Sequence, residues 1–184
     1  MTIELVSYAD LKSLLGLEEA LITAYPDLSL IKDSVVTAIE SYLDRDLDYG
    51  EYQDNQFFNK ATAYIKLNAL PIESVESVIV KQSGEATTLT ADDYMIMNYG
   101  LFLYSPSDLS SVSIEYTGGY ADDDVPTPIK RAALIQTTYE FQSKDHIGAS
   151  SVTNEGGSVQ RPEIGLLKEV RRLLDRYKHP LSWA

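Results

Sequence analysis

A change from strand to helix occurs within one stretch, Val112-Ser113-Ile114-Glu115-Tyr116-Thr117-Gly118-Gly119-Tyr120-Ala121-Asp122-Asp123-Asp124-Val125-Pro126. Its first residues alternate apolar and polar side chains, which is typical of a half-buried strand, and the glycine pair favours a turn out of that strand. The three acids and the proline that follow suit a helix N-terminus, because acids interact well with the helix dipole and proline fits the first turn. The stretch therefore predicts a strand followed by a helix from about residue 126.

Upstream of this stretch, the sequence predicts a small antiparallel sheet. After a polar loop at residues 46–51, short apolar or alternating segments recur between turn signals from about residue 55 to residue 120. The clearest strand candidates span residues 75–81, 87–90, 94–97, 101–104 and 112–116. The connections between them are too short for a crossover helix, so the strands are expected to pair as hairpins.

Helical patterns flank the predicted sheet on both sides. They cover residues 8–15, about 28–45, 126–145 and about 163–178. Residues 147–162 are rich in Gly and Ser and predict a mobile loop, and residues 163–184 form a last helix followed by an arm. The sequence thus predicts one α+β domain over residues 1–184, with two N-terminal helices within residues 1–50, two C-terminal helices and the small antiparallel β-sheet inserted between them.

Charge divides the chain into an acidic body and a basic C-terminal part. The 184 residues include 28 acids and 15 bases, but the last 59 residues hold 6 acids and 9 bases. An acidic body disfavours tight nucleic-acid binding, whereas the basic part indicates a different partner or the acidic body of a neighbouring copy. No apolar run approaches the roughly 18 residues that a membrane span needs, so no membrane partner is expected.

Candidates for chemistry are few. The chain has no cysteine, which excludes disulfides, thiolate metal sites and thiol nucleophiles. Asp122, Asp123 and Asp124 offer carboxylates to a divalent cation, but the EF-hand spacing is absent and a helix-dipole role explains them. His179 precedes a proline and is interpreted as an exposed cap of the last helix. We therefore expect no catalytic residues, no metal and no cofactor; a hydrolase that uses a carboxylate pair remains the enzymatic alternative.

Two features suggest protein contacts. The chain has 13 tyrosines against 4 phenylalanines, and tyrosine suits surfaces where a ring is half buried while its hydroxyl stays hydrated. The basic C-terminal helix either packs on the chain's own helices or docks on a partner. Its candidate docking residues are Lys168, Arg171, Arg172, Arg176, Tyr177, Lys178 and, near the end of the chain, Trp183.

The order of these segments resembles the head–tail connector, or adaptor, proteins of long-tailed bacteriophages and related gene-transfer particles. The most specific parts are Leu70-Pro71-Ile72-Glu73-Ser74-Val75 and Tyr116-Thr117-Gly118-Gly119-Tyr120 followed by Val125-Pro126. The segment Ala38-Ile39-Glu40-Ser41-Tyr42-Leu43-Asp44-Arg45 is also part of the resemblance, and Leu173-Leu174-Asp175-Arg176-Tyr177-Lys178 is similar to the way in which longer members of the family end. The resemblance extends, in order, over nearly the whole chain.

This resemblance implies a structural virion protein, made in the host bacterial cytoplasm and located at the head–tail interface. It implies a homo-oligomeric ring, commonly dodecameric, beneath the portal protein, which extends the DNA channel without binding DNA specifically and offers a platform to the next head-completion or tail protein. The C-terminal residues named above would bind the portal. Candidates for the ring or tail-side interface are Asp122, Asp123, Asp124, Tyr99 and Tyr120. A head-completion (stopper) or tail-terminator protein of the same virion is the alternative.

Overall fold

A computed structural model describes residues 3–15, 26–58, 62–105, 109–143, 152–154, 157–159 and 165–179. These residues form two compact units. The β unit contains residues 44–124 together with 178 and 179, and the helical unit contains residues 3–43 and 125–177 within the described ranges. Because the chain enters and leaves the β unit through the helical one, the β unit is an insertion, as the sequence predicts.

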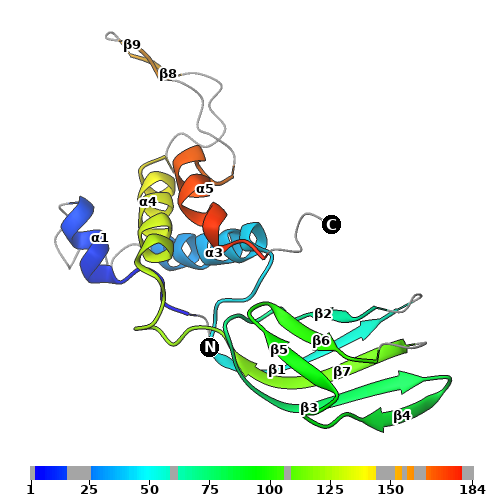
Figure 1. Cartoon of the computed structure of the whole chain (residues 1–184). Coiled ribbons are helices and arrows are strands. Elements are labelled where there is room, and N and C mark those ends of the chain that lie inside the picture. Colours follow the sequence, from blue (N-terminus) through cyan, green and yellow to red (C-terminus); the bar gives the residue numbers. More distant parts are fainter. Residues whose placement is uncertain are drawn as a thin grey trace. The chain divides into compact units, whose positions relative to one another are not determined.

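The β unit consists of two antiparallel sheets (Figure 1). The larger sheet has the order β1-β7-β3-β4, and the smaller sheet has the order β2-β6-β5. The strands are β1 (Gly50–Phe57), β2 (Tyr64–Lys66), β3 (Ile72–Gln82), β4 (Glu85–Thr88), β5 (Tyr94–Met97), β6 (Gly100–Leu103) and β7 (Leu109–Gly118). The central strand β7 pairs with β1 on one side and with β3 on the other.

The core of the β unit lies between the two sheets. Alternate residues of β3 and β7 pack on Ile65, Leu101 and Leu103 of the smaller sheet, and all of these side chains are buried. Tyr116 joins this core, where its hydroxyl accepts a hydrogen bond from the Ala69 amide at 2.9 Å and donates one to Asp54 at 3.1 Å. Burial raises the pKa of the Tyr116 hydroxyl, so it remains a neutral donor.

The helical unit contains α1 (Tyr8–Leu15), α3 (Pro26–Leu43), α4 (Thr127–Ser143), α5 (Lys168–Leu174), the 3-10 turn η2 (Asp175–Tyr177) and a short antiparallel pair, β8 (Val152–Asn154) and β9 (Gly157–Val159). Helix α4 packs against α1, α3 and α5. Helix α1 starts with the expected capping box, in which the Asp10 amide donates to Ser7 Oγ at 3.1 Å and the Ser7 amide to Asp10 at 3.4 Å. None of the described helices is long and apolar enough to cross a membrane.

The α+β class predicted from the sequence is confirmed, and the differences are local. Strand β1 begins at Gly50, inside the predicted polar loop. The sequence did not predict this strand, because its mostly polar residues show no alternation of apolar and polar side chains. The last helix is shorter than predicted, since residues 165–167 precede α5 without helical structure. Strands β8 and β9 lie where a loop was expected, and the other residues of 147–162 lie outside the described residues.

Candidate assembly surfaces

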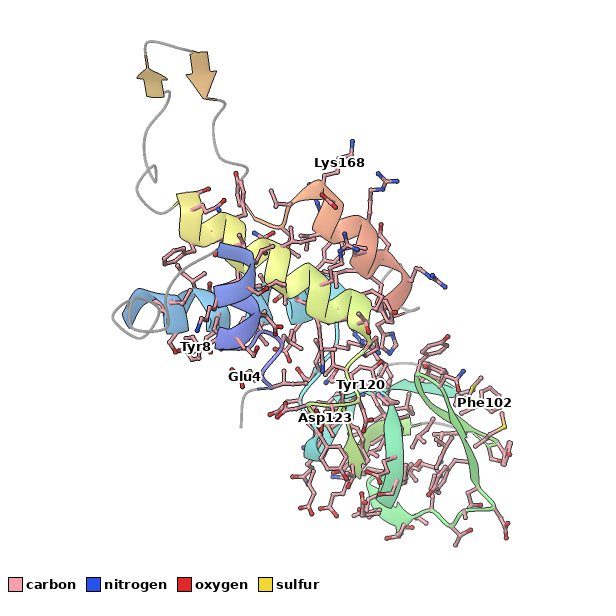
Figure 2. All side chains as sticks on the ribbon, turned by 90° about the vertical axis from the view of Figure 1, so that its left-hand side faces the viewer. Glu4, Tyr8, Phe102, Tyr120, Asp123 and Lys168 are labelled. Carbon is pink, nitrogen blue, oxygen red and sulfur yellow. The ribbon has the colours of Figure 1, made fainter. Side chains whose placement is uncertain are left out.

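Helix α5 has a buried face and a basic face. Val170 and Leu174, one turn apart, are fully buried among the helices of the helical unit. Lys168, Arg171 and Arg172 are exposed on α5, and Arg176 is exposed on the turn η2 that continues it; we call these four cations the basic face of α5. Lys168 stands at the start of α5, with its side chain extended away from the helix (Figure 2). The helix is therefore part of a core and still presents a positively charged surface.

A buried glutamine fixes the start of α5. Gln136 of α4 is 1% exposed, and its carbonyl oxygen accepts the Leu167 amide at 3.0 Å. Its amide nitrogen donates to the Gly165 carbonyl at 3.2 Å and to Glu140 at 2.9 Å. Leu167, at the N-cap of α5, makes no side-chain capping hydrogen bond. Gln136 therefore supplies hydrogen-bond partners at the start of the helix that the neighbouring residues in sequence do not provide. At the other end, the Tyr42 hydroxyl donates to Asp175 at 2.7 Å.

The acidic triplet forms an exposed turn after β7. Gly119 has φ +94°, and a Cβ there would lie 1.9 Å from the Asp48 carbonyl oxygen, so only glycine fits. The Tyr120 amide then donates to the Leu47 carbonyl at 2.8 Å, and the Asp124 amide closes the turn on Ala121 at 2.9 Å. All three aspartates are exposed. Among the described residues, no group of three or more acids or histidines is arranged to hold a metal ion.

Beside this turn lies a shallow groove of about 480 Å³, which we call the Tyr49 groove. Its lining combines apolar and aromatic residues with two carboxylates and includes Tyr49, Ile72, Glu73, Tyr120 and Asp124. The Tyr49 hydroxyl donates to Glu73 at 2.5 Å, and this hydrogen bond raises the pKa of Tyr49. The groove thus combines aromatic rings with accessible negative charge, which is suited to a cationic side chain.

A third surface is the β5–β6 hairpin. Cross-strand pairing places Met95 beside Phe102, and both side chains face solvent together with Met97. The ring of Phe102, labelled in Figure 2, lies 6.3 Å from that of Tyr104, which is 56% exposed. Ile96, on the opposite face of β5, is 50% exposed. Because β5 is an edge strand without charge or proline, this apolar surface is of the kind that a partner covers.

His179 contradicts the prediction of an exposed helix cap. Its side chain is fully buried in the β unit, where Nε2 lies 3.1 Å from the Tyr99 carbonyl oxygen and the two rings meet edge to face. Burial lowers the pKa of His179, the hydrogen bond to Tyr99 opposes this effect, and Lys66 lowers the pKa further. The prediction failed because burial here depends on a contact across 80 sequence positions.

The structure brings together some of the predicted interface residues. Tyr120 and Asp124 both line the Tyr49 groove, whereas Tyr99 lies on the turn between β5 and β6. Their role at an interface stays a prediction, and Trp183 lies outside the described residues. Sequence reasoning missed Tyr49 and Glu73 because nothing local links them. It also missed the apolar hairpin, although apolar residues at consecutive positions 95–97 leave that strand no polar face, a signal that was available.

Comparison with known proteins gives matches in structure only. No protein-family model and no curated protein sequence matches the chain. Solved structures with a similar fold include the neck of an empty GTA particle computed with C6 symmetry, at TM-score 0.59 and 16% identity over 92% of this chain and 87% of that chain. The neck of a native GTA particle computed with C12 symmetry matches at TM-score 0.54 and 15% identity, over 92% and 86% of the two chains.

A chain in the virion of a native gene transfer agent (GTA) particle matches at TM-score 0.53 and 14% identity, over 83% of this chain and 76% of that chain. At these identities the likeness shows a shared fold. It extends over most of each chain, so it includes both the β unit and the helical unit.

Proposed function

We propose that this chain is a structural subunit of a virion neck, where head and tail meet, and that it assembles there as a ring. The observation that carries the proposal is the fold shared with neck components of gene transfer agent particles over 92% of the chain. Those necks were computed with C6 and C12 symmetry, which supports a cyclic arrangement. The order of segments along the sequence, which resembles that of head–tail connector proteins, supports the same proposal independently of the structure.

The surfaces of the chain suit a ring. A closed ring of identical subunits needs two different surfaces that meet head to tail. The chain presents a basic helix face, an acidic aromatic groove and an apolar hairpin, and these surfaces differ in chemistry from one another. A monomer with several such surfaces is typical of a component that is covered on assembly.

Within the neck, we place the ring beneath the portal, with the DNA channel running through it. The C-terminal arm, with its basic residues and Trp183, is the proposed portal contact. The acidic corner at Asp122–Asp124 and the exposed Tyr99 belong, in this proposal, to ring or tail-side contacts. A lumen with acidic character would let DNA slide, because it offers no counter-charge to phosphates.

Native mass spectrometry of the purified chain, alone and with the portal protein of its own particle, tests the proposal. We expect multi-copy rings once the portal is present, with a copy number that electron microscopy of the complex confirms as a cyclic symmetry. A closed dimer that does not associate with the portal would contradict the proposal. A turnover activity lost on alanine substitution at Asp122, Asp123 and Asp124 would instead favour the hydrolase alternative.

A further inference from the structure

The Tyr49 groove and the basic face of α5 are chemically complementary. We propose that the arginines of α5 in one copy dock into the Tyr49 groove of the next copy, so that the ring closes through a contact between a helical unit and a neighbouring β unit. This inference rests on the proposed ring and names its interface. Because the groove and the helix face are different surfaces, each copy can serve two neighbours.

The groove has the features that a guanidinium group needs. Tyr49 and Tyr120 supply ring faces for cation–π contact, and Glu73 and Asp124 supply exposed carboxylates for charge-assisted hydrogen bonds. The hydrogen bond from the Tyr49 hydroxyl holds Glu73 beside the ring. The described residues already use this chemistry, since the guanidinium of Arg45 lies 5.5 Å from the centre of the Tyr120 ring.

Helix α5 supplies the matching cations. Lys168, Arg171, Arg172 and Arg176 are exposed, and none of them forms an ion pair within the described part of the chain. Arg172 lies in α5 and Arg176 in the 3-10 turn η2 that follows it. Both side chains are exposed and four positions apart, so both are available to a neighbouring groove. Arginine also suits such a site better than lysine, because its planar group binds carboxylates and stacks on rings at once.

The overall charge favours the same pairing. Residues 44–124 carry 15 acids and 4 bases, whereas residues 168–178 carry 5 bases and 2 acids. Opposite potentials of this kind accelerate encounter and set the register of an interface. This inference narrows the portal contact proposed above: Lys168, Arg171, Arg172 and Arg176 serve the ring, and residues from Tyr177 onward are left for the portal.

Charge reversal tests the contact. One variant carries Glu73→Arg and Asp124→Arg in the groove, and a second carries Arg172→Glu and Arg176→Glu in the helix. Native mass spectrometry with the portal protein present is expected to show that each variant alone needs about tenfold or more higher concentration to form rings. A control with Glu85→Arg and Glu115→Arg makes the same charge change at exposed positions on β4 and β7 outside the groove, and should assemble like the unmodified chain.

Mixing the two reversed variants gives a more specific test of the contact. An equal mixture of the two reversed variants should recover rings in which the two masses alternate, because each groove then meets a helix of opposite charge. A single chain that carries all four reversals should recover rings as well. Circular dichroism of every variant checks folding. If a reversal does not fold, the neutral variants Glu73→Gln and Arg172→Gln replace it and should lower the salt concentration at which rings dissociate.

The outcomes separate this inference from the proposed function. Rings that form with the helix-reversed variant but no longer bind the portal would assign α5 to the portal and overturn the groove contact. Rings lost in both variants and not recovered on mixing would also overturn it. Closed dimers of the unmodified chain in place of rings would overturn this contact as well, because the proposed docking is head to tail. Absence of rings in the unmodified chain would reject the proposed function itself.

Discussion

The hydrogen bonds of Gln136 allow the stability of the contact between α4 and the start of α5 to be predicted. Replacing Gln136 by leucine keeps a side chain of similar size and removes three hydrogen bonds, to the Leu167 amide, the Gly165 carbonyl and Glu140. A buried hydrogen bond contributes about 1 kcal/mol net, and the loss leaves the groups at the start of α5 to be satisfied by water. Because leucine recovers part of this through apolar burial, we expect a loss of roughly 2 kcal/mol.

The matched control is Gln142→Leu, the same substitution on the same helix at an exposed position. Surface changes of this kind stay within about 0.5 kcal/mol. Thermal unfolding followed by circular dichroism at a helix-sensitive wavelength should therefore place the midpoint of Gln136→Leu about 4–8 °C below that of the control. Hydrogen exchange should show faster exchange of the Leu167 amide. Equal midpoints for the two variants would refute the assignment of Gln136 as the residue that holds α5.

Further predictions concern the β unit. Burial lowers the pKa of His179, so as pH falls the unfolded chain binds a proton at this residue before the folded chain does. The free energy of unfolding should therefore drop as pH falls below about 6.5. His179→Gln should flatten this dependence in denaturant titrations compared at pH 7.5 and 5.5. Tyr116→Phe removes two hydrogen bonds from the core and should lower the free energy of unfolding by about 1–2 kcal/mol. The Tyr64 hydroxyl is buried without a partner among the described residues, so Tyr64→Phe should be neutral or stabilising. Chemical denaturation that ranks the two variants in the opposite order would contradict this. Met95→Ser together with Phe102→Ser should leave the unfolding midpoint within a few degrees and reduce binding of a hydrophobic dye, since both side chains are already exposed; a large loss of stability would mean that the hairpin belongs to the core.

Local signals were sufficient where neighbours in sequence are also neighbours in space. The capping box at Ser7 and Asp10 requires only residues three positions apart, and the structure forms it as expected. The alternation at residues 112–116 predicts the central strand β7 for the same reason. Strand β1 escaped detection because its pairing with β7, not its own composition, makes it a strand.

The candidate surfaces divide in the same way. The basic character of residues 168–178 is a property of composition and is visible without a structure. The Tyr49 groove is not, because its residues come from positions 49, 73, 120 and 124, which only the pairing of β1, β7 and β3 brings together. The burial of His179 likewise depends on Tyr99, a distant residue, so no local pattern could predict it.

The amino-acid sequence by itself thus determined the four helical segments, the α+β class, the position of the β region between helices and the separation of acidic from basic segments, but not strands β1, β8 and β9. Each of these follows from propensity, periodicity or charge within a few residues. The tertiary structure alone decided that His179 is buried, which apolar side chains of β5 and β6 remain exposed and which distant residues share a groove. These properties arise from pairing and packing between segments far apart in the chain, where the free energy of burial, and not local preference, selects the arrangement.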